Sequence, residues 1–284
     1  MTPQQTITAG IDGSLESLEA ADWAAREALR RDLPLHLVHA YDQPSDRSRL
    51  PEIEVPFHRE SGALDRAVLR LAAAHPALGI LDEQVTGPPV ESLLATAGSA
   101  ALLVLGSRGF GALTGALVGS VALSVAARAV CPVVLVRAGE HPDDGREDQA
   151  AGTHRPVVLG LDLDHPCDEL LEFAFTTAAV RHAPLQVVHA YTVPLLPATD
   201  ATNPEVAKSH LLGAALTPWR HKFPATQVTE RLVRGLAGHH LVKETAGAGL
   251  LVIGRRIPAG EHLGPTAHSV IHHAKDPVAI VPHN

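Results

Sequence analysis

The chain of 284 residues contains an internal duplication, and this feature constrains its fold more than any other. Residues 8–12 (TAGID) match residues 158–162 (VLGLD), and residues 34–41 (PLHLVHAY) match residues 184–191 (PLQVVHAY). Residues 97–106 and 245–254 also correspond, as do the segments 132–136 (PVVLV) and 277–281 (PVAIV). A repeat of this length indicates two copies of one domain. We therefore predict domains at residues 1–137 and 156–284.

Residues 138–155, between the copies, are rich in Gly, Asp, Glu and His and show no apolar period, which is typical of a solvated linker. In the first copy, short aliphatic strands alternate with amphipathic helices. The strands are predicted at Ile7–Ile11, Leu35–Ala40, Leu81–Val85, Leu102–Leu105 and Val133–Val136, and the helices at Leu15–Arg31, Leu64–Ala74, Val90–Ala97 and Ser120–Arg128. This alternation predicts two tandem five-stranded parallel doubly wound α/β domains of the Rossmann-like kind.

Composition excludes several classes of protein. The net charge of −8 argues against nonspecific binding to nucleic acid or anionic lipid. Apolar runs such as residues 100–105 are too short to span a bilayer, and the opening MTPQQ lacks the basic region of a secretory signal. Two cysteines, Cys131 and Cys167, are too few for a disulfide framework, so we expect both to be buried fillers in a cytoplasmic protein.

The candidate site lies in the loops that follow the first and fourth strands, because ligands of open α/β sheets bind beyond the carboxyl ends of strands. Asp12-Gly13-Ser14 follows the first strand. A glycine-rich stretch from Gly106 to Ser120 follows the fourth strand and opens a helix. Glycines let backbone N–H groups approach a phosphate, and the start of a helix favours an anion. The chemistry of this loop suits a phosphate cradle.

Rival interpretations fit these residues less well. No Walker A lysine and no G-x-S-x-G nucleophile elbow occurs in the loop. The glycines Gly109, Gly111 and Gly115 follow the fourth strand, whereas a dinucleotide fingerprint follows the first. Glycines at such a junction can also be simple turn residues, and Asp12 could be a helix cap. His268 and His272 are four residues apart on a predicted helix, but no third ligand accompanies them, so we expect no metal site.

The spacing Gly106-x2-Gly109-x9-Gly119-Ser120 resembles the nucleotide-binding signature of the universal stress protein family. The GIDGS opening at residues 10–14, the strand 37–40, the turn at 87–89 and the terminal segment 131–136 also match, so the resemblance covers essentially the whole chain. It implies a tandem ATP-binding protein with strand order 3-2-1-4-5 in each domain.

The resemblance also implies a role for each matching residue. Asp12, after Gly10, would contact the ribose side of adenosine, and the backbone of Ala40 would contact adenine. Ribose and phosphates would be held by Gly106, Gly109, Gly119 and Ser120, with Val121 adding an N–H group and Arg108 either reaching the phosphates or facing solvent. The cofactor would be ATP, with or without Mg²⁺.

The second copy departs from this signature. Ile257 replaces the second glycine, the loop is shortened, and Gly264-Pro265 replaces Gly-Ser. Proline removes an N–H group from the start of the helix. We therefore expect ATP to bind the first copy tightly and the second weakly or not at all. The residues of a possible weak second site are Asp162, Ala190, Gly254, Arg255, Gly264 and Thr266, with Arg255 and Arg256 able to hold a smaller anion.

The leading hypothesis is an adenine-nucleotide-binding sensor or regulator of the stress response, with at most slow ATP hydrolysis and an unknown protein partner. One alternative is a nucleotide-free module that acts by dimerisation, and another is an adenine-nucleotide-using enzyme of the wider HUP class. We also predict that the edge strands Val133–Val136 and Val278–Val281 pair within the chain as a pseudo-dimer. A homodimer is a further possibility.

Overall fold

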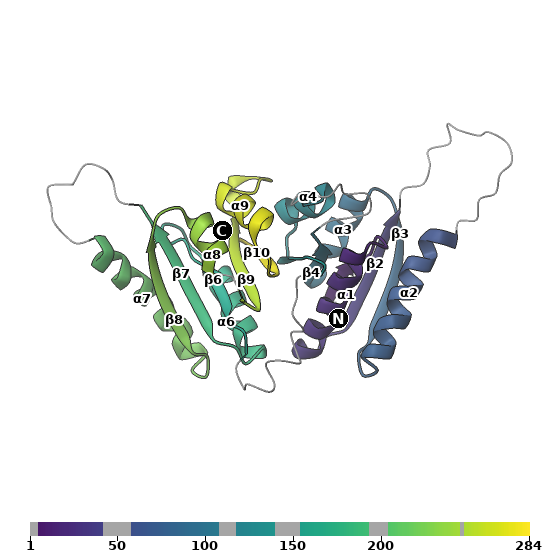
Figure 1. Ribbon diagram of the computed structural model, residues 1–284, viewed down its shortest axis with the longest axis horizontal. Helices are drawn as coiled ribbons and strands as arrows, with labels where there is room; N and C mark the ends of the chain where they lie inside the picture. The colour runs from purple at the N-terminus through teal and green to yellow at the C-terminus, as the bar shows by residue number, and fades with distance from the viewer. Residues whose placement is uncertain (1–4, 42–57, 108–117, 140–153, 193–203, 245–246) are drawn as a thin grey trace. The chain divides into compact units, whose positions relative to one another are not determined.

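The structure is a computed structural model that describes residues 5–41, 58–107, 118–139, 154–192, 204–244 and 247–284 (Figure 1). These residues form two compact units, divided between Gly139 and Glu140. We call them the first and second units and describe each by itself. None of the described helices is both long and apolar enough to cross a membrane.

The first unit is a parallel sheet whose strands alternate with helices. Its elements are β1 (Thr6–Gly10), α1 (Leu15–Arg31), β2 (Leu35–Tyr41), α2 (His58–Ala74), β3 (Ile80–Thr86), α3 (Pro89–Ala97), β4 (Ala100–Gly106), α4 (Ser120–Arg128) and β5 (Val133–Val136). The strands lie in the order β3-β2-β1-β4-β5, and every described pairing is parallel. This confirms the predicted strand order.

The second unit repeats the same architecture. Its elements are β6 (Val157–Gly160), α6 (Asp168–Val180), β7 (Leu185–Tyr191), α7 (Pro204–Lys222), β8 (Val228–Arg234), α8 (Ala237–Glu244), β9 (Leu250–Arg256), the 3₁₀ turn η1 (Ile257–Ala259), α9 (Pro265–His273) and β10 (Val278–His283). The strand order β8-β7-β6-β9-β10 is the counterpart of that in the first unit, and all pairings are again parallel. The duplication seen in the sequence is therefore a duplication of structure.

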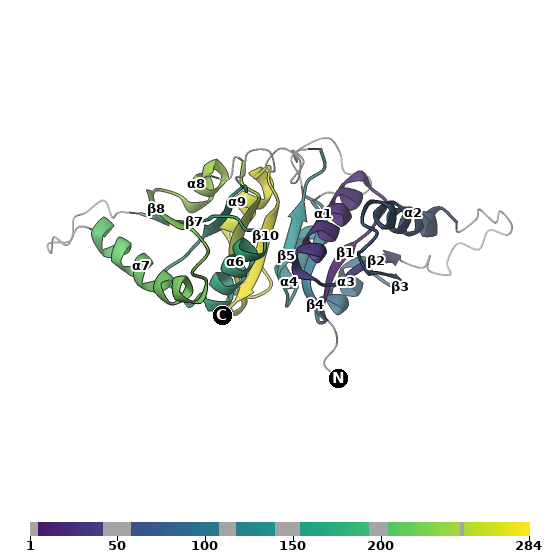
Figure 2. The same ribbon diagram turned by 90° about the horizontal axis from the view of Figure 1, so that it is seen from below.

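Helices cover both faces of each sheet (Figure 1, Figure 2). In the first unit, α1 packs beside α2 on one face and α3 packs beside α4 on the other. In the second unit the corresponding neighbours are α6 with α7 and α8 with α9. The carboxyl ends of the central strands therefore open between two helical layers, where the winding direction reverses.

The cores consist mainly of Ala, Val and Leu, as the low aromatic content predicted. The largest fully buried side chains are Trp23 on α1 and Phe175 on α6. In the second unit, Phe175 also packs against the rings of Trp219 and Phe223. Burying these side chains supplies the main favourable term for folding each unit.

Element bounds were predicted well where a cap marks a helix. Helices α1 and α4 have the predicted limits, because Ser14 caps α1 and Gly119 ends the extended segment before α4. Strand β5 also has the predicted limits, and the other four strands of the first unit differ from prediction by one or two residues at one or both ends. Helix α2 ends at Ala74 as predicted, but its predicted start was wrong, since this helix begins at His58 rather than Leu64.

One cysteine departs from expectation. Cys131 is buried, as predicted, but Cys167 is only half-buried and lies at the start of α6. Burial, followed by the charges of Asp168, Asp162 and Glu169, raises the pKa of the Cys167 thiol to about 11. This cysteine therefore stays a thiol at neutral pH, and it lies close to the candidate site of the second unit.

Candidate functional site

The loop after β1 holds the first predicted site residue, Asp12, at the edge of the sheet. Asp12 Oδ1 accepts hydrogen bonds from the backbone N of Ser14 (2.9 Å) and from Ser14 Oγ (2.5 Å). Ser14 Oγ in turn accepts a bond from the N–H of Ser17 (3.1 Å), which caps α1. Gly13 between them has φ +83°, a conformation that favours glycine. The Asp12-Gly13-Ser14 loop is thus a rigid turn that displays an exposed carboxylate.

Gly106, at the end of β4, serves a close packing contact. A Cβ atom at this position would lie 2.8–2.9 Å from the backbone and Cβ of Glu16, in the first turn of α1. Similarly, a Cβ atom on Gly10 would lie 2.6 Å from Leu105 Cδ2. Both glycines were predicted to contact the ligand. In the structure, Gly106 lets β4 approach α1, and Gly10 leaves room for side chains from β4 and α3.

The start of α4 is the predicted phosphate position. Gly119 is extended, with φ −64° and ψ 146°, and its N–H donates to the carbonyl of Ser107 (2.8 Å). That N–H is therefore occupied, so an anion here would meet the following N–H groups, of Ser120 and Val121. Two further predicted residues, Arg108 and Gly109, lie outside the described residues.

Ser107 was not predicted as a site residue, yet it is 3% exposed and its hydroxyl has no hydrogen-bond partner in the described part of the chain. Its counterpart in the second unit is Arg255, which is also buried, at 7% exposed. Burial lowers the pKa of Arg255. An alignment of the two copies places Ser107 opposite Arg255. This exchange of a serine for an arginine could have marked the position as part of the site.

The end of the second strand is built alike in both units. His39 Nδ1 contacts the carbonyl of Ile11 at 2.6 Å, and His189 Nδ1 contacts the carbonyl of Leu161 at 2.9 Å. These bonds tie each second strand to the residue that precedes the site aspartate. Ala40 and Ala190 follow directly, half-buried, with their backbones at the edge of the sheet.

A pocket of about 270 Å³ opens at the strand ends of the second unit. It is lined from β6, β7, β9 and β10 and from α6, α8 and α9. Four of the six residues predicted for this site line it: Asp162, Ala190, Gly254 and Thr266. Arg255 and Gly264 are not among its lining residues. Cys167, Arg256 and His283 line it as well. Arg256 was predicted only as a possible holder of a smaller anion, and Cys167 and His283 were not predicted for this site.

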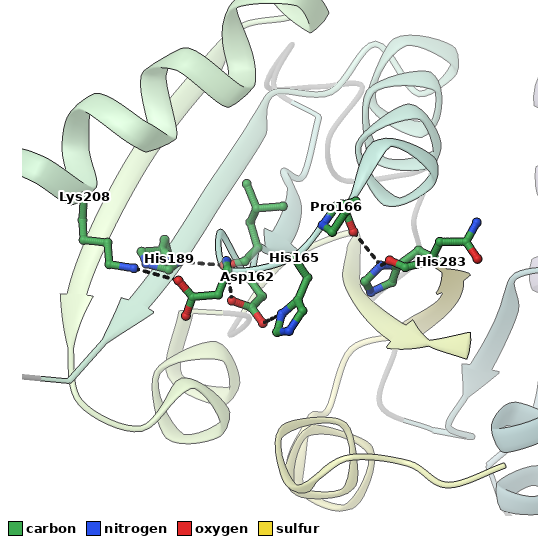
Figure 3. Close-up of polar contacts among 9 residues, drawn as sticks. Asp162, His165, Pro166, His189, Lys208 and His283 are labelled. Atoms are coloured by element: carbon green, nitrogen blue, oxygen red, sulfur yellow. Dashed lines mark hydrogen bonds and ion pairs between the residues drawn. The ribbon is translucent and has the colours of Figure 1, made fainter. Parts of the chain in front are cut away.

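Asp162 supplies the negative charge of this pocket (Figure 3). Its Oδ1 accepts the N–H of Asp164 (3.1 Å), and its Oδ2 contacts Nδ1 of His165 (3.0 Å). Burial alone would raise the pKa of Asp162, but the hydrogen bonds from Asp164 and His165 and the charges of His165 and His189 outweigh it and lower the pKa. The carboxylate is therefore ionised at neutral pH.

His283 comes to this pocket from the last strand. Its Nδ1 contacts the carbonyl oxygen of Pro166 at 3.1 Å (Figure 3) and the backbone oxygen of Asn284 at 3.0 Å. The residue is 5% exposed. A Cβ atom on Gly254 would collide with Nε2 of this ring. In the second unit, the imidazole thus lies over Gly254. In the first unit, the first turn of α1 lies over the equivalent Gly106.

Comparisons with known proteins agree with this architecture. The universal stress protein family model matches residues 4–137 and 153–282. Universal stress protein Rv2005c of Mycobacterium tuberculosis is 32% identical over 98% of this chain and 97% of its own length. A universal stress protein from Archaeoglobus fulgidus matches the fold over 98% of this chain and 96% of its own, with a TM-score of 0.67 and 17% identity.

A universal stress protein solved in complex with cAMP is 33% identical and spans 47% of this chain and 97% of its own, with a TM-score of 0.38. The full-length relative and the two family matches decide the assignment. The chain belongs to the universal stress protein family, with two such domains in tandem.

Proposed function

We propose that the protein is an ATP-binding regulator of the stress response, in which the first unit holds the nucleotide. The observation that carries the proposal is the pocket at the strand ends of the second unit, because it shows that this fold opens a ligand-sized hollow there. Its lining residues Asp162, Ala190 and Thr266 correspond to Asp12, Ala40 and Val121 of the first unit. The duplicated sequence therefore supports a site at the same place in both units.

The first unit offers the better chemistry for a triphosphate. Helix α4 begins with Ser120 and Val121, whose N–H groups lack partners within the helix, and Ser120 adds a hydroxyl. In the second unit, proline opens α9 and removes one of these donors. Asp12, fixed by Ser14, would accept hydrogen bonds from the ribose hydroxyls.

The proposal assigns binding and signalling to the protein, with hydrolysis slow at most. Mass spectrometry of the small molecules released from freshly purified protein tests it most simply. We expect ATP or another adenine nucleotide in the released fraction, and Asp12→Ala should reduce its amount. Protein that carries no nucleotide and binds none added in solution would overturn the proposal and favour the dimerisation module.

We also propose that β5 pairs with β10 within the chain, since each is the last strand of its own sheet order and an unpaired edge invites association. Cysteines placed pairwise along the two strands test this pairing. An intrachain disulfide that forms in one register supports it. Crosslinks formed between chains instead would show that these edges make a homodimer.

A further inference from the structure

Two histidines on α9 lie close together and take no part in the strand-end sites. His268 and His272 are four residues apart, so their side chains share one face of the helix. Their ring centroids lie 4.3 Å apart, with an angle of 42° between the ring planes. By comparison, the neighbouring rings of His239 and His240 on α8 lie 5.6 Å apart and are nearly perpendicular. The α9 pair therefore places two imidazoles within reach of a common ligand.

The spacing of the two rings suits one bound metal ion. Bonds from zinc to imidazole nitrogen are about 2.0–2.1 Å long, so two imidazoles that hold one ion at a right or tetrahedral angle have centroids about 4.5–5.2 Å apart. A small side-chain rotation brings the observed separation into that range. His268 is exposed, so its ring has room to rotate and solvent can reach the pair. Two histidines four residues apart on one helix face also hold zinc in the H-E-x-x-H motif of metalloproteases.

The surroundings of the pair favour a cation. His272 lies in the last turn of α9, at the negative end of the helix dipole. Helix α8 packs against a different side of α9: a Cβ atom on Gly238 would lie 2.9 Å from Cβ of Ser269 and 3.8 Å from Cα of Thr266. The face that carries the two imidazoles is therefore not the face that α8 covers.

The corresponding helix of the first unit shows that the fold does not require histidine here. Helices α4 and α9 both have nine residues and align without a gap, which places Leu123 and Ala127 opposite His268 and His272. Ala127 is buried and Leu123 is half-buried. Two apolar residues of one copy are thus replaced by two histidines in the other. Packing of the helix on its sheet does not account for this exchange, whereas ligation of a metal does.

We infer that His268 and His272 bind one divalent transition-metal ion of the kind that prefers imidazole, such as Zn²⁺ or Ni²⁺, with water in its remaining positions. The expectation of no metal site rested on the missing third ligand. No group of three or more His, Cys, Asp or Glu side chains in the described part of the chain could hold a metal, so the pair itself is the site. Once one imidazole binds the ion, the second binds it intramolecularly and adds affinity without a third ligand.

The test is calorimetry on the full chain with NiCl₂ and, separately, ZnCl₂, in a buffer that contains no nucleotide and does not chelate metals. We expect one tight site per chain for either ion. His268→Ala and His272→Ala should each weaken binding by about 100-fold, because each leaves a single imidazole. The double variant should lose little more than either single variant, because both residues act on one ion. His239→Ala, which removes an exposed histidine from α8, is the matched control and should change affinity by less than about threefold.

Melting curves give a second readout. A metal that binds only the folded protein stabilises it by mass action, so Zn²⁺ should raise the melting temperature of wild type and of His239→Ala but not that of His268→Ala. His268 is exposed, so its replacement should leave the metal-free melting temperature nearly unchanged. If His272→Ala does not fold, His268→Ala alone decides.

Several outcomes would overturn the inference. One is wild-type protein that binds neither Ni²⁺ nor Zn²⁺, and another is a loss in His268→Ala no larger than that in His239→Ala. Losses that add in the double variant would show two separate single-histidine contacts instead of one shared ion. Mg²⁺ prefers oxygen ligands, so MgCl₂ that competes as well as ZnCl₂ would contradict ligation by imidazole. None of these outcomes depends on whether the protein binds a nucleotide.

Discussion

The strand-end sites of the two units share a fold but are completed by different parts of the chain. In the first unit, α1 begins at Leu15 and its first turn packs on Gly106. In the second unit, α6 begins only at Asp168, and the ring of His283 from the last strand fills the space over Gly254. The glycine is common to both copies, but it packs against a different neighbour in each. A shared residue in a duplicated fold does not by itself indicate a shared contact.

The same contrast extends to the residue after each glycine. Ser107 and Arg255 occupy equivalent places, and both are buried. The exchange of a small hydroxyl for a guanidinium changes the surroundings of the pocket without changing the sheet. We therefore propose that the second site is altered rather than erased, and the following predictions each test one part of that difference.

The largest effect is expected from Gly119→Glu in the first unit. The new carboxylate would stand at the start of α4, where a phosphate approaches, and like charges there oppose binding. Gly119 has ordinary extended backbone angles, so glutamate fits the chain. We expect ATP affinity to fall by about 100-fold or more while the melting temperature changes little. A folded variant with unchanged ATP affinity would exclude this loop from the site.

The two strand-end glycines should differ in their tolerance of alanine. Gly106→Ala would press on the backbone of Glu16, so we expect the free energy of unfolding to fall by about 1–3 kcal/mol. Gly254→Ala would press on the side chain of His283, which can move, and should cost less. His283→Ala combined with Gly254→Ala should recover part of that loss. Urea unfolding measures all three variants, and equal costs without recovery would contradict the packing account.

These glycines also show how far the sequence could predict the site. The apolar patterns were enough to predict α1 and the alternation of strands and helices, whereas the strand order rested on the family resemblance. They could not predict the late start of α6, and the site contact of His283 joins residues 117 positions apart. The early start of α2 could not be predicted either, because residues 58–61 are polar and carry no apolar period.

The smallest effect concerns Asp162. Because its folded pKa lies below the ordinary value of 3.8, the ionised carboxylate stabilises the second unit above that pH. The contribution is lost as the pH falls through the lower folded pKa. The melting temperature of Asp162→Asn should therefore fall less than that of wild type as the pH is lowered from about 4 to about 2. The control is Asp65→Asn, which removes an exposed carboxylate on α2. Identical curves of melting temperature against pH for Asp162→Asn and wild type would contradict the lowered pKa.

The central claim, that the two sites differ in kind, is tested most directly by titrating the full chain with ATP in a calorimeter. We predict one tight site per chain, with the second weaker by about two to four orders of magnitude. Asp12→Ala should remove most of the heat, whereas Asp162→Ala should leave it nearly unchanged. Two equivalent tight sites, each lost with its own aspartate, would contradict the account.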